Sequence, residues 1–371
     1  MRRSLPLAAG LLAASTLATA ARAAEPLPEV TITVTRLPTN IDQVGSSVSV
    51  ITANEIQQSQ RIVFSDLLDR VPGISVSRSG GLGGVTTSFV RGAASERTLV
   101  LIDGVKVNDM SSPGGGFNFA NLLSDDITRA EILRGPQSTL YGTDAIGGVI
   151  DIVTASAHKP LEVSGMAEGG SFGTARGNAA IGSAGDRYNI RSSVSYVDTT
   201  GISSADAAHG NTEPDGYDNV TVYTKGEADL AAPVKIGGTV RYSKADAQFD
   251  SFAFSGPYPI VDGNEASKTR EFQGSGWIDV SLLDGKLHNL LRVSRSTIDR
   301  DSYLDDALNF TARSHSTQID YQGTLRLMNA VSFLFGGDIE NNAMRTEGYG
   351  SVTRGTADIK GVFGEMQVTL F

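Results

Sequence analysis

The stretch Ile127–Thr154, which reads ITRAEILRGPQSTLYGTDAIGGVIDIVT, decides the fold of this chain. Two β-rich runs, Ala130–Leu133 and Gly148–Val153, flank a segment that contains the short motifs RGP, YG and GG. Glycine permits backbone conformations that are closed to other residues, and proline fixes its own φ and donates no hydrogen bond. We therefore predict two strands that are joined by a tightly folded turn and not by a swinging linker.

Composition excludes several classes of protein. The chain has 31 Lys and Arg against 41 Asp and Glu, a net charge of −10, and no cysteine. It thus lacks the basic footprint of a nucleic-acid-binding protein, and it can form neither disulfides nor thiolate metal sites. Beyond the N-terminus no run of ~18 apolar residues occurs, so no membrane-spanning helix is expected. A soluble β protein or an outer-membrane β-barrel remains.

The N-terminal segment Met1–Ala23 has the three parts of a secretory signal peptide. Arg2 and Arg3 precede the apolar run Leu5–Ala14, and the letters ARA at residues 21–23 form a small-x-small cleavage site. An anchor helix is the alternative, although the apolar run is short for a bilayer. We predict export to the periplasm or outer membrane of a Gram-negative cell.

The next part of the sequence predicts a small α+β domain that ends near Ala157. Residues 52–55, TANE, form a capping box for a helix toward Gln60. Ser65 is predicted to cap a second helix, Asp66–Arg70. Strands are expected at Val48–Ile51, Ile74–Ser77, Val85–Arg91, Thr98–Ile102 and Ile127–Leu133.

From Pro160 onward the sequence alternates apolar and polar residues over long runs. A barrel needs this period of two when lipid lies outside and water inside, although a soluble sandwich gives the same pattern. The turn at Gly169–Gly173 matches the letters GxSxG, but it lacks the strand and helix of a hydrolase elbow and is predicted as a periplasmic turn. No constellation supports an enzyme. About ten strands are predicted, centred near Val163, Ala179, Val194, Val222, Thr239, Gly276, Val293, Gly323, Phe335 and Gln367.

The number of residues sets a limit on this barrel. A barrel wide enough to enclose a folded domain needs on the order of 22 strands, because about eight strands leave room only for side chains. Only 371 − 159 = 212 residues follow Lys159, which is too few. The sequence is therefore expected to be the N-terminal part of a longer, C-terminally truncated chain.

Two further motifs, LVLIDGVKVND (Leu99–Asp109) and LLDRVPGISV (Leu67–Val76), complete an ordered set with Ile127–Thr154. The set resembles the plug domain of TonB-dependent outer-membrane transporters, nearest the cobalamin branch. The resemblance implies a signal peptide at 1–23, a TonB box and α+β plug at 24–157, and the N-terminal portion of an antiparallel transmembrane β-barrel at 158–371. It also implies a receptor without enzymatic activity that takes up a large scarce nutrient, cobalamin or alternatively a ferric siderophore.

The segment just before the plug alternates β-branched residues behind Pro28, and such a segment can add as a strand to the sheet of another protein. An ordinary first strand is the alternative. The resemblance identifies the segment as a TonB box made of Glu29, Val30, Thr31, Ile32, Thr33, Val34 and Thr35. The partners it implies are TonB, outer-membrane lipid and the nutrient, with no nucleic acid, for a chain that acts as a monomer.

Two neighbouring loops are rich in oxygen ligands, and calcium takes roughly six to eight of these. A solvated acidic loop is the alternative. No cofactor is required, but the resemblance to cobalamin transporters implies that calcium orders these loops, with ligands at Asn211, Glu213, Asp215, Asp250 and Asp262.

The plug loops Gly80–Ser88 and Met110–Asn121 are predicted to face the substrate. The resemblance implies substrate contacts at Val85, Thr87, Ala94, Ser112 and Pro113. Ala94 replaces an asparagine and loses amide hydrogen bonds worth roughly 0.5–1.5 kcal/mol, which leaves the ligand open. A non-transporting binding protein, either a surface adhesin or a truncated relic, is the rival function, and a periplasmic enzyme is a more distant one.

Overall fold

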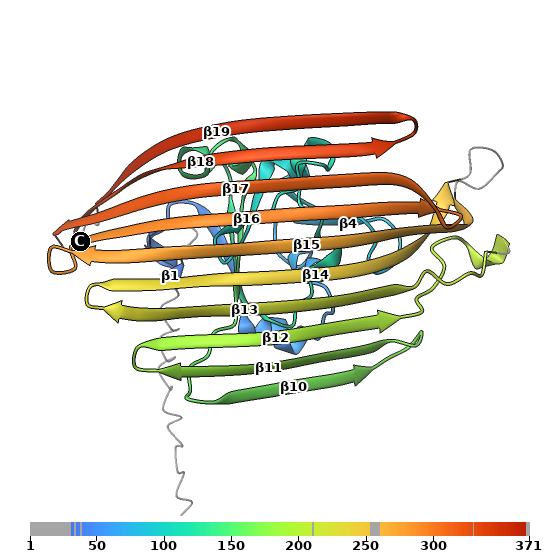
Figure 1. Cartoon of the computed structure of the whole chain (residues 1–371), viewed down its shortest axis with the longest axis horizontal. Helices are drawn as coiled ribbons and strands as arrows, with labels where there is room; N and C mark the ends of the chain where they lie inside the picture. Colours follow the sequence, from blue (N-terminus) through green and yellow to red (C-terminus); the bar gives the residue numbers. More distant parts are fainter. Residues whose placement is uncertain are drawn as a thin grey trace, which may run out of the picture.

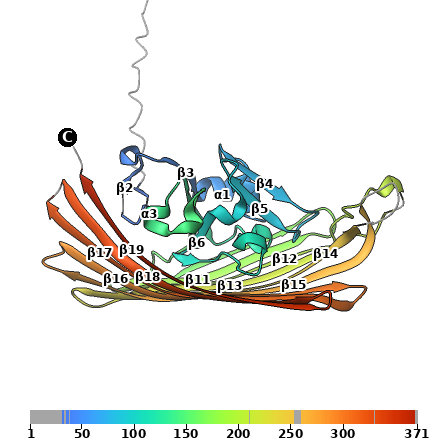
Figure 2. The same ribbon diagram turned by 90° about the horizontal axis from the view of Figure 1, so that it is seen from above.

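The computed structural model describes residues 31–32, 35–37, 39–209, 211–252, 260–328 and 330–368. The predicted signal peptide lies outside the described residues, as do Glu29, Val30, Thr33 and Val34 of the predicted TonB box. Two parts make up the described chain. A long curved sheet, which we call the wall, holds a small α+β unit, which we call the plug, on its concave side (Figures 1 and 2).

The wall is a ten-stranded antiparallel sheet in which every strand pairs with its neighbours in sequence. The prediction of ten strands is confirmed, although Gln367 lies at the end of its strand and not at the centre. The strands are β10 (Glu162–Gly169), β11 (Ala175–Gly185), β12 (Tyr188–Thr199), β13 (Tyr217–Ala231), β14 (Val234–Phe252), β15 (Ile260–Leu282), β16 (Leu287–Leu304), β17 (Ala307–Met328), β18 (Val331–Gly348) and β19 (Ser351–Val368).

Strand β12 illustrates how the alternating pattern forms the wall. Its residues Ile190 and Val194 are exposed, whereas Ser193 and Ser195 are buried. The buried serines face the plug, because the hydroxyl of Ser193 donates to Asp126 of the plug at 2.6 Å. The outer face of the wall is therefore apolar and the inner face polar, as in an outer-membrane barrel. A second sheet packed over this outer face, as in a sandwich, is absent among the described residues.

The plug is built on a five-stranded sheet in the order β3-β8-β9-β6-β7. Strands β6 and β9 run parallel, and the other neighbours run antiparallel. One face buries Val100, Ile132 and Ile150 in the main core, and the other buries Leu99 and Val149 in a smaller one. The strands are β3 (Ser47–Thr52), β6 (Thr98–Ile102), β7 (Val105–Lys106), β8 (Ile127–Arg134) and β9 (Gly148–Thr154).

The helices of the plug are short. Helix α1 (Ala53–Ser59) starts with the predicted capping box, because Thr52 Oγ1 accepts from Glu55 N at 3.3 Å and Thr52 N donates to the Glu55 carboxylate at 2.7 Å. Helix α2 (Ser65–Leu68) differs from the prediction. Ser65 lies inside the helix, where its hydroxyl accepts from Arg78 at 3.0 Å, and it does not cap. No helix among the described residues is long and apolar enough to cross a membrane.

The deciding stretch folds much as predicted. Strands β8 and β9 pair antiparallel, and the N–H of Gly135 donates to the carbonyl of Gly147 at 3.0 Å to close the intervening loop. Gly135 has φ 112°, which favours glycine. The loop also contains one helical turn that the sequence did not predict, α3 (Ser138–Tyr141).

Short elements complete the plug. A separate hairpin, β4–β5, lies close to a wall loop, since a Cβ on Gly80 between its strands would lie 2.9 Å from Ser204 Oγ. Strand β1 pairs with β2. Their bounds are β1 (Thr31–Ile32), β2 (Thr39–Asn40), β4 (Ile74–Arg78), β5 (Thr86–Val90), η1 (Ile41–Gln43), η2 (Ser95–Arg97), η3 (Pro113–Gly115), η4 (Phe119–Asn121) and η5 (Thr143–Ala145), and the wall loop carries η6 (Ala207–His209).

The turn Gly169–Gly173, between β10 and β11, was predicted to lie at the periplasmic end of the wall, but it lies at the opposite end. The N–H of Thr200 donates to the carbonyl of Phe172 at 3.0 Å, so this turn adjoins the long β12–β13 connection. Outer-membrane barrels have short periplasmic turns and longer extracellular loops. The Gly169–Gly173 turn is therefore extracellular, and its prediction as a periplasmic turn was wrong because its short length hid which end it closes.

Candidate functional site

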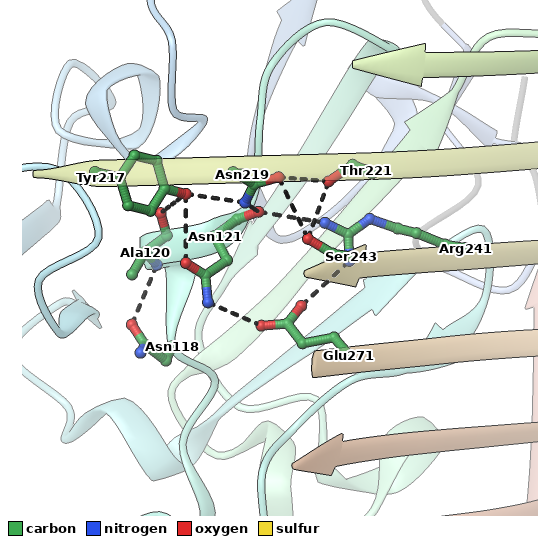
Figure 3. A network of polar contacts seen from close by, with 9 residues as sticks. All are labelled: Asn118, Ala120, Asn121, Tyr217, Asn219, Thr221, Arg241, Ser243 and Glu271. Carbon is green, nitrogen blue, oxygen red and sulfur yellow. Dashed lines mark hydrogen bonds and ion pairs between the residues drawn. The ribbon is translucent and has the colours of Figure 1, made fainter. Parts of the chain in front are cut away.

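Buried polar side chains join the plug to the wall (Figure 3). From the wall, Asn219 Nδ2 donates to the carbonyl of Asn121 at 3.3 Å and to Tyr217 Oη at 2.9 Å. Arg241 Nη2 also reaches the carbonyl of Asn121, at 3.4 Å, while its Nη1 pairs with Glu271 at 3.2 Å. The side chain of Asn121 donates to the same Glu271 carboxylate at 3.4 Å. Plug and wall thus share one buried hydrogen-bond network.

Ion pairs fasten the plug at further points. Lys106 of the plug lies 2.6 Å from Asp144 and 2.7 Å from Glu340 of the wall. Burial disfavours the charged Lys106 ammonium, but attraction to Glu340 and Asp144 outweighs burial and raises its pKa. Lys225 of the wall pairs with Asp103 of the plug at 2.7 Å. These ion pairs hold the plug to the wall by charge.

A cavity of about 650 Å³ lies between the plug sheet and the wall. Asp103, Lys106 and Asp151 line it from the plug, and Arg292 lines it from the wall. Burial, followed by the neighbouring Glu131 and Asp103 carboxylates, raises the pKa of Asp151 to about 7. None of the five predicted substrate residues lines this cavity. It is therefore separate from the predicted substrate surface.

The raised pKa of Asp151 gives a pH prediction. Its ordinary pKa is 3.8, so between that value and about 7 the folded chain binds more protons than the unfolded chain. Stability from this group is therefore lost as pH rises through that window. We expect Asp151→Asn to stabilise the protein by at least about 1 kcal/mol at pH 8 and by little at pH 4. Urea unfolding at both pH values measures this.

A matched variant completes the pH test. Asp284→Asn makes the same change in an exposed turn of the wall, and we expect an equal and small effect at both pH values. A stability of Asp151→Asn that depends on pH as steeply as the wild type would contradict the assignment of the titration to Asp151.

The five predicted substrate residues fall into two groups on the plug. Val85 and Thr87 belong to the β4–β5 hairpin, with Val85 exposed. Ala94 precedes η2, and Ser112 and Pro113 begin η3. Ala94 and Pro113 are exposed, and Thr87 and Ser112 are half-buried. All five are therefore at least partly exposed to solvent, as residues that contact a ligand must be.

Close packing brings the two groups into one region. A Cβ on Gly114 of η3 would lie 2.8 Å from the side chain of Glu96 in η2, so these two turns touch. The hairpin joins them through Thr86, whose N–H donates to Asn118 Oδ1 at 2.8 Å. A Cβ on Gly83 would lie 2.4 Å from Tyr217 of the wall. The plug loops thus form one surface against the extracellular end of the wall.

The structure also brings together four of the five residues predicted to bind calcium. Asp250 accepts from Ser203 Oγ at 3.0 Å and from Ala205 N at 2.6 Å. Asp215 accepts from the N–H of Ser204 at 2.8 Å. The N–H of Asp262 donates to Asn211 Oδ1 at 3.2 Å. Glu213 is exposed, and its backbone N–H donates to Asp262 at 3.4 Å.

Hydrogen bonds hold together the acidic cluster for which the sequence predicted a calcium ion. In the part of the chain that the structure describes, no three His, Cys, Asp or Glu side chains are grouped as they would be to hold a metal ion. One oxygen, Asp250 Oδ1, is nevertheless buried without a hydrogen-bond partner. The pKa of Asp215 is raised above its ordinary value, mainly by burial. The hydrogen bonds from Ser204 lower this pKa, and the neighbouring Asp250 and Glu213 carboxylates raise it. The sequence did not single out Ser204 or Ala205, because serine and alanine carry no charge signal.

Of the predicted TonB box, the structure describes Thr31, Ile32 and Thr35. The first two form β1, which pairs with Thr39–Asn40. The next residue, Arg36, lies 3.0 Å from Asp320 of the wall and stacks over the ring of Tyr141 at 4.6 Å. The chain is therefore anchored to the wall immediately after the predicted box.

This architecture defines the class of protein. Residues 40–149 match the family described as the TonB-dependent Receptor Plug Domain. The chain therefore contains a TonB-dependent receptor plug domain followed by an antiparallel wall, and these two parts together are those of an outer-membrane protein.

Curated relatives and solved structures refine this class. The chain is 41% identical over 128 residues to the vitamin B12 transporter BtuB of Vibrio vulnificus strain CMCP6, covering 34% of this chain and 21% of the relative. It is 32% identical over 232 residues to BtuB of strain YJ016, covering 61% of this chain and 35% of the relative. The sequence similarity thus lies with the cobalamin branch, and the chain spans about a third or less of these relatives.

A structural match extends over the wall. The siderophore receptor PirA from Acinetobacter baumannii superposes with a TM-score of 0.68 at 15% identity, covering 87% of this chain and 54% of that one. At this identity the match speaks for the fold alone. It confirms the predicted arrangement of a plug against an antiparallel barrel wall.

Proposed function

We propose that this protein captures cobalamin at the cell surface and passes it through the outer membrane in a TonB-dependent step. The observation that carries the proposal is the plug. Its family match goes with sequence similarity to a vitamin B12 transporter, and buried polar contacts fasten it to the wall beside two small apolar clusters. Polar contacts can be exchanged for water, so the parts of the plug that they hold can shift without leaving polar groups unpaired. In this proposal residues 24–157 are the TonB box and plug, and residues 158–371 belong to the barrel.

The proposed partners follow from the N-terminal segment, the outer face of the wall and the net charge of the chain. TonB pairs with Glu29–Thr35 by strand addition, for which an extended, β-branched segment is suited. Outer-membrane lipid covers the apolar outer face of the wall, with Ile190 and Val194 among its exposed residues. The chain acts as a monomer and binds no nucleic acid, since its net charge is −10.

Calcium is a proposed ligand of the extracellular loops. The residues fit a cation in one respect, because Asp250 Oδ1 is buried and lacks a hydrogen-bond partner. Asn211, Asp215, Asp250 and Asp262 would supply the oxygens, and Glu213 would join from its exposed position. The ion would replace the hydrogen bonds that now hold these carboxylates and would fix the loops above the plug.

A ferric siderophore is the alternative ligand, and one residue favours it. Ala94 is exposed on the predicted substrate surface, where the cobalamin plugs offer an asparagine. A methyl group cannot make the two-way hydrogen bonds of an amide. A non-transporting binding protein is the remaining alternative, and it differs in having surface binding without uptake.

Equilibrium binding of cyanocobalamin to outer membranes that contain the protein tests the proposal, with calcium and with a chelator. We expect binding that calcium strengthens. Asp215→Ala should weaken binding about tenfold, or about 1.4 kcal/mol, with calcium and leave it unchanged in chelator. Asp186→Ala, an exposed turn residue outside the cluster, is the control and should change neither.

The outcomes separate the two parts of the proposal. Absence of cyanocobalamin binding, with a ferric siderophore bound instead, would reject cobalamin as the ligand. An equal loss for Asp215→Ala with calcium and in chelator would reject the metal role and leave the cluster as a hydrogen-bonded loop anchor.

A further inference from the structure

Asp109 is a buried carboxylate at the base of a predicted substrate loop. It follows strand β7 and is 1% exposed. Its Oδ1 accepts from the N–H of Ser111 at 2.8 Å and from the hydroxyl of Ser111 at 2.7 Å. Its Oδ2 accepts from the hydroxyl of Ser112 at 2.8 Å. One side chain therefore organises both serines of the loop.

The same carboxylate ties the loop to the wall. Ser314 of β17 donates its hydroxyl to Asp109 Oδ1 at 2.7 Å. Arg300 of β16 places Nη1 at 3.9 Å from Oδ2. Asp109 thus lies where the plug loop and two wall strands meet, and it accepts the hydrogen bonds of Ser111, Ser112 and Ser314.

The backbone of the loop is fixed around Asp109 as well. The N–H of Ser112 donates to the carbonyl of Asp109 at 3.1 Å, and the N–H of Gly115 donates to the carbonyl of Ser112 at 3.0 Å. The side chain of Asn108 donates to the carbonyls of Thr98 at 3.1 Å and Gly115 at 3.3 Å. The loop is therefore held at its start and end, and Ser112 has a defined direction.

The donor and acceptor roles follow from the chemistry of the groups. An ionised carboxylate has no proton to give, so each hydroxyl in contact with it must be the donor. Serine has one hydroxyl proton and two lone pairs. Once the proton of Ser112 is committed to Asp109, only its lone pairs remain for a ligand. Ser111 is in the same state.

We propose that Asp109 is a positioning residue that locks the Ser111–Pro113 loop against the wall and turns Ser112 into a hydrogen-bond acceptor toward the ligand. The site then selects a ligand that presents N–H donors there, such as the primary carboxamides around a corrinoid ring. An anionic group at this point meets lone pairs and a carboxylate behind them, which is unfavourable. This inference rests on the proposed function and specifies which face of its substrate the plug reads.

Hydrogen exchange tests the positioning role without any ligand. In Asp109→Asn the amide group can accept at one oxygen only, and its nitrogen faces a serine hydroxyl that has to turn around. We expect amide exchange of residues 110–116 to speed up at least about tenfold in outer-membrane preparations. Asp306→Asn, the same change in an exposed wall turn, should leave these amides unchanged.

Binding tests the acceptor role. The probes are cyanocobalamin, its monocarboxylic acid derivatives, in which one peripheral carboxamide is a carboxylate, and anionic ferric enterobactin. We expect wild type to discriminate against at least one of the acids about tenfold or more. Asp109→Asn and Ser112→Ala should both lose most of that discrimination, and Asp109→Asn should speed up the exchange of the loop more than Ser112→Ala, which removes one of the hydrogen bonds to Asp109.

Each result decides a separate claim. Unchanged exchange in Asp109→Asn would overturn the positioning role, whether or not any ligand binds. Equal affinity of wild type for cyanocobalamin and for every acid would overturn the acceptor role. If wild type binds no cobalamin, the proposed function fails, and tight binding of ferric enterobactin that Asp109→Asn does not alter would overturn the inference independently.

Discussion

Glu271→Ala is expected to destabilise the protein by about 3–5 kcal/mol, because it leaves the guanidinium of Arg241 buried without its carboxylate. The two side chains are 5% and 6% exposed and lie 3.2 Å apart. The change also removes the acceptor of Asn121, so the loss falls on the contact between plug and wall. Urea unfolding in detergent or lipid measures the loss, and faster proteolysis of the plug would accompany it.

A matched pair and a double variant test this explanation. Glu347 pairs with Arg345 at 2.6 Å, but the side chains are 53% and 50% exposed. Glu347→Ala should therefore cost less than about 1 kcal/mol. Replacing both partners of the buried pair, Arg241→Met with Glu271→Leu, should recover most of the stability, since no charge is then left unpaired. Equal costs for the buried and exposed pairs would contradict the role of burial.

The strands of the wall were predictable because their signal is local. In β12, the side chains of Ile190 and Val194 alternate with those of Ser193 and Ser195, and this period of two follows from the pleat of any strand. The capping box of Thr52 and Glu55 was predictable for the same reason, since its partners are three residues apart. Strand β7 was missed because two residues carry no period.

The contacts that hold the plug in place could not be read from the sequence. Asp109 meets Ser314, and Lys106 meets Glu340, across more than 200 residues. Alternation predicts which residues face the lumen, but it does not fix which strand lies opposite which plug loop. Register and curvature decide that, and they depend on the whole wall. The role of Asp109 was missed for this reason, although Ser112 beside it was singled out.

The acidic loops were predictable only in part. Their composition and the family resemblance singled out Asn211, Asp215, Asp250 and Asp262, and the structure brings these residues together. The donors that hold them, including the N–H groups of Ser204 and Ala205, are set by backbone geometry. Backbone donors are present at every residue except proline, so the sequence cannot indicate which ones are used.

Val34→Pro is expected to reduce energised uptake of cyanocobalamin to background while surface binding stays intact. In the proposed function Glu29–Thr35 pairs with TonB as a strand, and proline removes a backbone N–H and blocks that pairing. Binding should survive because the anchor that follows is separate. Arg36 pairs with Asp320 at 3.0 Å, and its carbonyl accepts from Gln322 at 2.9 Å.

The matched variant is Val34→Thr, which keeps a β-branched side chain and the N–H, and which should transport normally. Asp320→Asn tests the anchor itself, because it leaves Arg36 stacked on Tyr141 but removes its partner carboxylate. A pulling force on the TonB box would act first on Arg36, which follows it. Weakening the Arg36–Asp320 pair should therefore let the plug detach more readily and make the plug more sensitive to protease, without stopping uptake. Uptake by Val34→Pro at the wild-type rate would reject the TonB box and leave Glu29–Thr35 as an ordinary first strand.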